Sequence, residues 1–313
     1  MIFPIALAAL LTTAPDCTDE QMTEMTRASD TAYVLTCQPR LDPSVTLTRR
    51  LIIESGSDNL ALDCQGGTLG RIGVPVAASA PTVMIRSSKI DGRWQPVRNV
   101  SIRNCRIYGA VRIWGMGADG SYDELRASSR TADHTRNLQA LAPTGINLQN
   151  LHITAQGTIP LYIGPGVTGV HLTQSRLDGT TTATAIYLDA ESADNRITDN
   201  QIVTRTGREM IAIDGSARNL IQNNRLDLHG QPGIYLYRNC GERGVIRHQT
   251  PSNNIIRSNS FTGASWLRPR LVVENTRNGR RSYCRADAGY PFGSSLDDRD
   301  NASGNRIENN RRN

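Results

Sequence analysis

A short sequence motif recurs along the chain at intervals of about 24 residues. It consists of an aliphatic residue, two variable residues, an asparagine, one further residue and a second aliphatic or aromatic residue. The clearest copies are ITDNQI (197–202), IQNNRL (221–226) and IRSNSF (256–261). Looser copies begin at positions 102, 148, 172 and 307, where longer gaps indicate insertions. Self-similarity at this period is typical of a solenoid, in which each repeat stacks on the previous one.

Each central repeat also carries a second run of strand-forming residues. These runs are PLYIG (160–164), AIYLD (185–189), MIAID (210–214), GIYLY (233–237) and RLVVE (270–274). Two or three short strands per coil predict an all-β fold, a single-stranded right-handed parallel β-helix. A βαβ protein would need an amphipathic helix between its parallel strands, and these intervals are too short and too polar. A leucine-rich repeat would need a regular Leu-x-x-Leu-x-Leu frame, which the sequence lacks.

The motif asparagines occupy equivalent positions in successive coils. We expect them to stack inside one turn of the solenoid, where each side-chain amide bonds to the next coil and satisfies backbone groups at the bend. This is a structural role, and the predicted ladder is Asn200, Asn224, Asn259 and Asn310.

The repeats resemble those of the pectate-lyase-like superfamily of carbohydrate-active parallel β-helices, over residues 45–312. The segment LALDCQGGTLG (60–70) is also similar to a first-coil segment of that superfamily. The resemblance implies a polysaccharide, often rich in uronic acids, that lies along the strands. It also implies β-elimination, epimerisation or glycoside hydrolysis. The Asp-Pro-His-Asp run of alginate epimerases and the Gly-His-Gly and Arg-Ile-Lys elements of polygalacturonases are absent, so no known catalytic set transfers to this chain.

The N-terminal part divides into two segments ahead of the repeats. Residues 1–14 are uncharged, apolar and end in small residues, which predicts a signal peptide and a secreted or periplasmic protein. A buried N-terminal strand is the alternative. Residues 15–44 form the predicted cap, with a helix over 19–29 covering the open end of a β-helix domain at 45–313. No segment is long and apolar enough to predict a transmembrane helix.

Six cysteines fit export, because an even number in an exported chain predicts disulfides. Zinc is disfavoured because the chain has no Cys-x-x-Cys pair. The sequence proposes one pairing, Cys240 with Cys284, which would join two loop insertions. The pairing of the others stays open: Cys17, Cys37, Cys64 and Cys105.

The net charge of +6 favours anionic partners in general. An anionic polysaccharide is the predicted partner. Nucleic acid is not predicted, because Trp and Phe are scarce and no recognition motif is present. The chain is taken to be a monomer.

Alternation of side chains along the strands predicts two outward-facing columns. One contains Tyr162, Tyr187, Ala212, Tyr235 and Val272, and the other contains Gly164, Asp189, Asp214, Tyr237 and Glu274. Adjacent coils lie about 4.8 Å apart, so the two aspartates are expected to be neighbours on a solvent-facing surface. Their repulsion would be relieved by a shared proton, by a bound cation such as calcium, or by an arginine. Calcium is the one cofactor considered.

Three insertions are expected to frame a substrate groove over this surface, because long loops on a regular solenoid usually carry binding function. They follow Tyr237, follow Glu274, and occupy residues 115–143, where His134 is a further candidate to approach substrate. A solvated ladder of alternating charges is the simpler alternative.

The predicted roles follow from the chemistry of polysaccharide cleavage. β-Elimination needs a group that neutralises the sugar carboxylate, a base and an acid. Hydrolysis would instead use the two aspartates directly, with a spacing that favours the retaining geometry. A non-catalytic binding or envelope protein is the remaining alternative. The predicted catalytic residues are Asp189, Asp214, Tyr237, Arg238 and His248. The predicted substrate-binding residues are Tyr187, Glu191, Arg208, Tyr235, Glu242, Arg247, Arg270 and Glu274.

Overall fold

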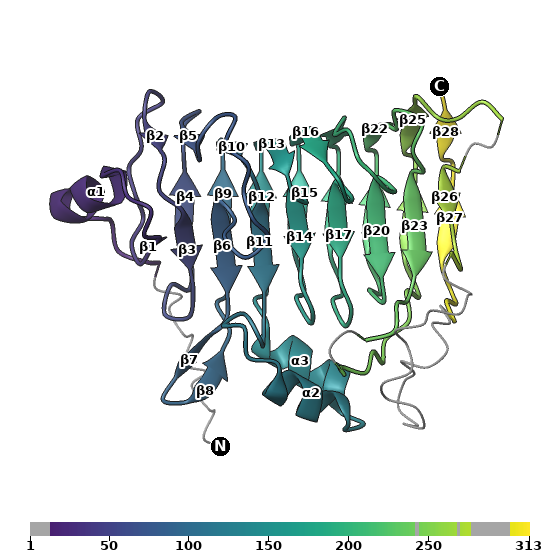
Figure 1. Cartoon of the computed structure of the whole chain (residues 1–313), viewed down its shortest axis with the longest axis horizontal. Coiled ribbons are helices and arrows are strands. Elements are labelled where there is room, and N and C mark those ends of the chain that lie inside the picture. The colour runs from purple at the N-terminus through teal and green to yellow at the C-terminus, as the bar shows by residue number, and fades with distance from the viewer. Residues whose placement is uncertain (1–12, 242–243, 268–269, 277–300) are drawn as a thin grey trace, which may run out of the picture.

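The computed structural model describes residues 13–241, 244–267, 270–276 and 301–313. Within these residues the chain winds as a right-handed parallel β-helix whose three sheets run along the length of the molecule (Figure 1). The predicted fold is therefore confirmed. Each full coil contributes one strand to each sheet, in the order first, second and third sheet.

The first sheet contains β1 (Tyr33–Val34), β3 (Leu51–Ile53), β6 (Val83–Arg86), β11 (Val111–Trp114), β14 (Leu161–Ile163), β17 (Ile186–Leu188), β20 (Ile211–Asp214), β23 (Ile234–Tyr237) and β26 (Val272–Val273). The second sheet contains β4 (Ala61–Asp63), β9 (Ser101–Arg103), β12 (Asn147–Gln149), β15 (His171–Thr173), β18 (Arg196–Thr198), β21 (Leu220–Gln222), β24 (Ile255–Arg257) and β27 (Arg306–Glu308). The third sheet contains β2 (Thr46–Leu47), β5 (Thr68–Leu69), β10 (Arg106–Tyr108), β13 (His152–Gly157), β16 (Arg176–Thr181), β19 (Gln201–Ile202), β22 (Arg225–Asp227), β25 (Ser260–Thr262) and β28 (Arg311–Arg312).

The core is a stack of aliphatic side chains that point inward from all three sheets. In the first sheet, Ile186 pairs with Ile211, and Ile211 pairs with Ile234. All three are fully buried. This burial fixes the register between neighbouring strands, because a slip by one residue would turn every aliphatic side chain of a strand to the outside.

The turn between the second and third sheets contains the predicted asparagine ladder, which is confirmed. The Nδ2 of Asn200 donates to Oδ1 of Asn224 at 3.0 Å across a separation of 24 residues, and the series continues through Asn259 to Asn310. The residue before each ladder asparagine adopts a left-handed conformation, as Asn223 does at φ 58°. A second ladder at the turn between the first and second sheets was not predicted, and it consists of Asn195, Asn219, Asn254 and Asn305.

The N-terminal end of the solenoid is covered by α1 (Asp19–Thr26), at the place where a helix was predicted over 19–29 (Figure 1). A capping box between Thr18 and Gln21 fixes its start, and its Met25 enters the core. None of the helices in the described ranges has the length and apolar content needed to cross a bilayer. Most of the predicted signal peptide lies outside the described residues.

Two disulfides lie wholly within the described residues, Cys17–Cys37 and Cys64–Cys105, which confirms the prediction that cysteines pair. Cys240 is also bonded in a disulfide. Its predicted partner, Cys284, lies outside the described residues.

The insertions leave the solenoid after first-sheet strands and gather at that end of the sheet (Figure 1). The hairpin of β7 (Ser88–Ile90) and β8 (Arg93–Gln95) follows β6. The helices α2 (Asp123–Ser129) and α3 (His134–Leu141) follow β11, within the predicted insertion 115–143. The segment after β23 packs on α2, because the backbone N–H of Ile246 donates to Oγ of Ser129 at 3.0 Å.

The last described strand of the first sheet corrects one prediction. Ile234 pairs with Val272 and Tyr235 pairs with Val273, one residue away from the expected register. Glu274 therefore does not continue the column of Asp214 and Tyr237. Its Oε1 instead accepts a hydrogen bond from Nδ2 of Asn305 at 2.6 Å.

Candidate functional site

The two aspartates at the ends of neighbouring first-sheet strands are brought together around one arginine. Nη2 of Arg247 lies 3.1 Å from Oδ1 of Asp189, and its Nη1 lies 2.5 Å from Oδ2 of Asp214. Burial alone would lower the pKa of Arg247, but the charges of both aspartates raise it well above its usual value. The repulsion between the two aspartates is therefore relieved by an arginine, one of the three means that the sequence suggested.

The predicted exposure of these aspartates is wrong. Asp214 has 0% of its surface exposed and Asp189 has 7%, because the segment after β23 folds over them. Asp214 also accepts hydrogen bonds from the hydroxyl of Tyr187 and from both nitrogens of Asn239. Every direction of approach to Asp214 is thus occupied, so this side chain anchors the covering segment and does not reach a substrate.

Asp189 differs from its neighbour because it borders a cavity. It accepts hydrogen bonds from the hydroxyl of Tyr162 and from the backbone N–H of Ala190. Burial raises the pKa of Asp189, against the lowering influence of Arg247. Burial likewise raises the pKa of Tyr162 well above its usual value. The pair forms a hydrogen-bonded acid couple at the cavity wall.

The cavity has a volume of about 280 Å³ and lies between the outer face of the first sheet, helices α2 and α3, and the segment after β23. Apolar side chains of the two helices, Leu125 and Leu138, form part of its wall. Its polar and aromatic lining comprises Arg112, Trp114, Tyr122, His134, Tyr162, Asp189, Glu191 and Arg247. A small enclosed space with a few converging polar groups is the usual form of a ligand site.

Arg112 is the most unusual member of this lining. It is only 7% exposed, and its guanidinium carbon lies 4.0 Å from the ring centre of Tyr162 and 4.9 Å from that of Trp114. Within the described residues it has no ion pair, and its Nε is buried without a hydrogen-bond partner. Burial lowers the pKa of Arg112, although an arginine remains cationic at neutral pH. Asp189 acts on this charge electrostatically, but the free Nε leaves a buried donor that is well suited to receive an anion.

His134 places an imidazole in the same cavity. Its Nδ1 lies 3.0 Å from Oγ of Ser128, and its ring packs against that of His248 with 5.0 Å between centroids. Burial lowers the pKa of His134, which keeps the ring neutral at pH 7. A neutral imidazole is able to accept a proton.

Glu191 links α3 to the segment after β23, and both of these form walls of the cavity. It is buried at φ 62° and accepts hydrogen bonds from the hydroxyl of Thr135 on α3 and from the backbone N–H groups of His248 and Gln249. The imidazole of His248 in turn bonds the carbonyl of Ser129 through Nε2 at 2.7 Å. Glu191 and His248 therefore position the covering segments.

Most of the remaining predicted residues lie further along the sheet. Tyr237 is fully buried and donates to Oε1 of Glu209 at 2.8 Å, while Arg208 contacts both. Tyr235 and Arg270 line a smaller cavity of about 230 Å³ beside them. Arg238 is buried, and its Nη1 reaches the carbonyl of Arg247 at 3.5 Å. Glu242 lies outside the described residues.

Sequence reasoning missed the importance of Arg112, Trp114 and Tyr162 at this site. Tyr162 was expected to face solvent but is buried by the helices that follow β11. The strand VRIW (111–114) shows the same alternation as the other first-sheet strands, and Arg112 pairs with Tyr162 in register. That alternation could have identified Arg112 as an outward-facing residue of the first sheet. It was overlooked because the insertion after β11 interrupts the 24-residue spacing of the repeats.

Within the described ranges, no three His, Cys, Asp or Glu side chains gather in a way that would hold a metal ion. A scan against protein-family models gives no match to the chain, and searches of curated proteins and of solved structures give none either. What is shown is the parallel β-helix, and the superfamily suggested by the repeats stays a resemblance.

Proposed function

We propose that the chain is an exported carbohydrate-active protein that takes an acidic sugar of an anionic polysaccharide into the cavity beside Arg112 and cleaves its linkage by β-elimination. The observation that carries the proposal is the buried guanidinium of Arg112, whose Nε has no hydrogen-bond partner among the described residues, next to the Tyr162–Asp189 couple. Two disulfides support export, because such bonds persist in oxidising compartments.

The lining supplies one group for each need of the reaction. Arg112 binds the sugar carboxylate and stabilises the charge that develops on it when the adjacent C–H bond breaks. His134, neutral because of its lowered pKa, accepts that proton. Tyr162 donates its proton to the departing glycosidic oxygen, and Asp189, which accepts the hydrogen bond of the Tyr162 hydroxyl, holds that hydroxyl in place. Solvent then returns a proton to Tyr162 and removes the one taken by His134.

The size of the cavity limits the substrate. A space of about 280 Å³ is at the small end of ligand pockets and suits a single sugar residue with its acidic group. A chain terminus or a side branch is therefore the expected point of attack. Hydrolysis by the two stacked aspartates is disfavoured, because Asp214 has no exposed surface.

The test is Arg112→Gln, assayed by the absorbance of the new conjugated double bond on oligomers of galacturonate, glucuronate, mannuronate and guluronate. We expect the variant to lose at least about 10²-fold in rate, as for loss of one charge-stabilising donor in a preorganised site. Arg136→Gln on the exposed surface of α3 is the matched control and should retain full activity. Equal rates in wild type and Arg112→Gln, with both folded by circular dichroism, would overturn the proposal.

A binding protein without turnover is the second candidate. It is favoured because both carboxylate oxygens of Asp214 already have hydrogen-bond or ion-pair partners. It is distinguished by calorimetry with the same uronate oligomers. Binding that depends on Arg112 with no double-bond absorbance on any oligomer would select this candidate over the enzyme.

A further inference from the structure

A second concave surface lies at the turn between the second and third sheets. This groove has a volume of about 960 Å³ and runs along the solenoid axis past the turns of six coils, from Gln65 to Asn223. Because adjacent coils are ~4.8 Å apart, it extends over roughly 24 Å. It shares no lining residue with the cavity beside Arg112.

The side chains along the groove follow from the register of the third sheet. The first positions of its strands pair in one column, and arginine occupies every second coil of that column. Uncharged or weakly basic polar residues occupy the coils between. In order, the paired residues are Thr68, Arg106, His152, Arg176, Gln201, Arg225, Ser260 and Arg311.

This arginine column carries a net positive charge inside the groove. Within the described ranges neither Arg106 nor Arg225 forms an ion pair, and both are exposed. Arg176 shares Asp178 with His152, at 3.1 Å and 2.7 Å respectively. Among the described residues, Asp199 is the one carboxylate that lines the groove.

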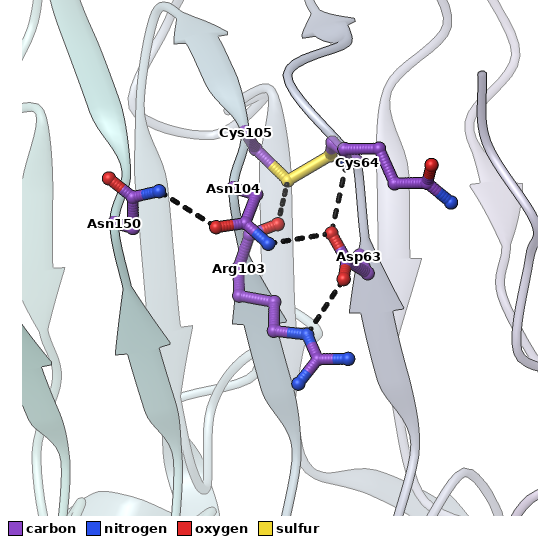
Figure 2. The surroundings of a disulfide bond; sticks show 7 residues. Asp63, Cys64, Arg103, Asn104, Cys105 and Asn150 are labelled. Atoms are coloured by element: carbon purple, nitrogen blue, oxygen red, sulfur yellow. Dashed lines mark hydrogen bonds and ion pairs between the residues drawn. A yellow bond between two sulfur atoms is a disulfide. The ribbon is translucent and has the colours of Figure 1, made fainter. Parts of the chain in front are cut away.

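The opposite side of the groove is a row of turn residues rich in amides. Each adopts a left-handed conformation, and some donate a hydrogen bond to the preceding coil. The row consists of Gln65, Asn104, Asn150, Gln174, Asp199 and Asn223. Figure 2 shows the N-terminal part of this row, where Asn150 donates to Asn104 and Asn104 donates to Asp63 beside the Cys64–Cys105 disulfide. Amides of this kind suit sugar hydroxyls, which both donate and accept hydrogen bonds.

We propose that this groove binds an extended polysaccharide that carries one anionic group on every second sugar. A pyranose residue in an extended chain advances by roughly the height of one coil, so alternate acidic sugars would meet successive arginines, with amides facing the hydroxyls between. Nucleic acid fits less well, because no Phe, Tyr or Trp lines the groove in the described residues to stack on bases. The site is separate from the proposed cleavage site and does not depend on it.

The test uses fluorescence polarisation with an end-labelled hyaluronan oligosaccharide, whose carboxylates alternate along the chain. The triple variant Arg106→Gln, Arg176→Gln and Arg225→Gln should weaken binding by about tenfold or more. A matched triple variant of exposed arginines outside the groove should bind as wild type does, namely Arg93→Gln, Arg98→Gln and Arg196→Gln.

Two further arms separate the possible outcomes. Monomeric glucuronate is too short to span the groove, so the groove variant should bind it as wild type does and Arg112→Gln should bind it more weakly. Failure of the cleavage proposal is thereby distinguishable from failure of this one. Dextran, which is neutral, should not bind. Equal loss in both triple variants, or wild-type binding by the groove variant with its fold intact by circular dichroism, would overturn the proposal. Tighter binding of single-stranded oligothymidylate than of hyaluronan would overturn it in favour of nucleic acid.

Discussion

At the scale of single residues, two aspartates in one column of the first sheet have different roles because only one of them borders the cavity. Asp189 and Asp214 follow equivalent strands and share Arg247. Asp214 is enclosed by hydrogen-bond donors, whereas Asp189 keeps a face on the cavity. Removing one partner of such a buried cluster leaves an uncompensated charge, so Arg247 is needed to keep the two acids side by side in the folded protein. Arg112, in contrast, forms no ion pair within the described residues and keeps a buried Nε without a hydrogen-bond partner.

The burial of His134 should make the stability of the folded protein depend on pH. Burial lowers its pKa from the ordinary value of 6.5, with His248 adding to the shift and Glu191 opposing it. The unfolded chain therefore takes up a proton that the folded chain resists, and stability is present above pH 6.5 and lost as the pH falls through the folded pKa. We expect the free energy of unfolding, measured with urea, to fall between pH 7.5 and 5.5.

The His134→Gln variant should lose part of this pH dependence. His229→Gln, at an exposed turn, serves as the control and should keep the wild-type profile. A His134→Gln profile parallel to that of the wild type would contradict the assignment.

At the scale of elements, the asparagine ladders explain why the turns can be so short. Asn224 accepts bonds from the backbone N–H and the Nδ2 of Asn200, and donates to the carbonyl of Ile197 and to Asn259. Each ladder side chain thus satisfies backbone groups that a tight bend would leave buried and unpaired.

Truncation of a ladder residue should be costly. We expect Asn224→Ala to lower the free energy of unfolding by roughly 3 kcal/mol, because several buried groups lose their partners together. Asn223→Gly is the matched neighbour, since it is exposed and glycine tolerates its left-handed conformation. Urea denaturation checks the difference, and equal losses in the two variants would show that the ladder contributes little.

The same repeat explains what could be predicted from the sequence and what could not. The motif fixed the position of Asn224 and the pairing of Asp189 with Asp214, because both follow from the coil period. The register of β26 was missed because Leu271, Val272 and Val273 offer two alternating frames, and packing decides between them. The burial of Asp189 depends on insertions that carry no repeat, so no periodic pattern signals it.

At the scale of the whole molecule, the solenoid keeps the proposed cleavage site and the proposed polysaccharide-binding groove on different surfaces. The cavity lies under the insertions on the first sheet, and the groove lies at the turn between the other two sheets. Within the sheets each coil pairs only with its neighbours, so a change in a coil that does not touch the insertions is expected to stay local. The Cys64–Cys105 disulfide joins neighbouring coils at the N-terminal part of the groove (Figure 2).

Loss of this disulfide should therefore weaken one end of the solenoid and spare the rest. A bridge across a separation of 41 residues stabilises by about 4 kcal/mol. We expect Cys64→Ala with Cys105→Ala to speed amide hydrogen exchange in β4, β5, β9 and β10 while β21 and β24 keep wild-type protection, because stability in a stacked array is a sum of neighbour terms. Removing Cys17–Cys37 instead should affect only the segment around α1. A uniform rise in exchange along all coils would mean that the solenoid unfolds as one cooperative unit, and the local picture on which the separation of the two surfaces depends would have to be abandoned.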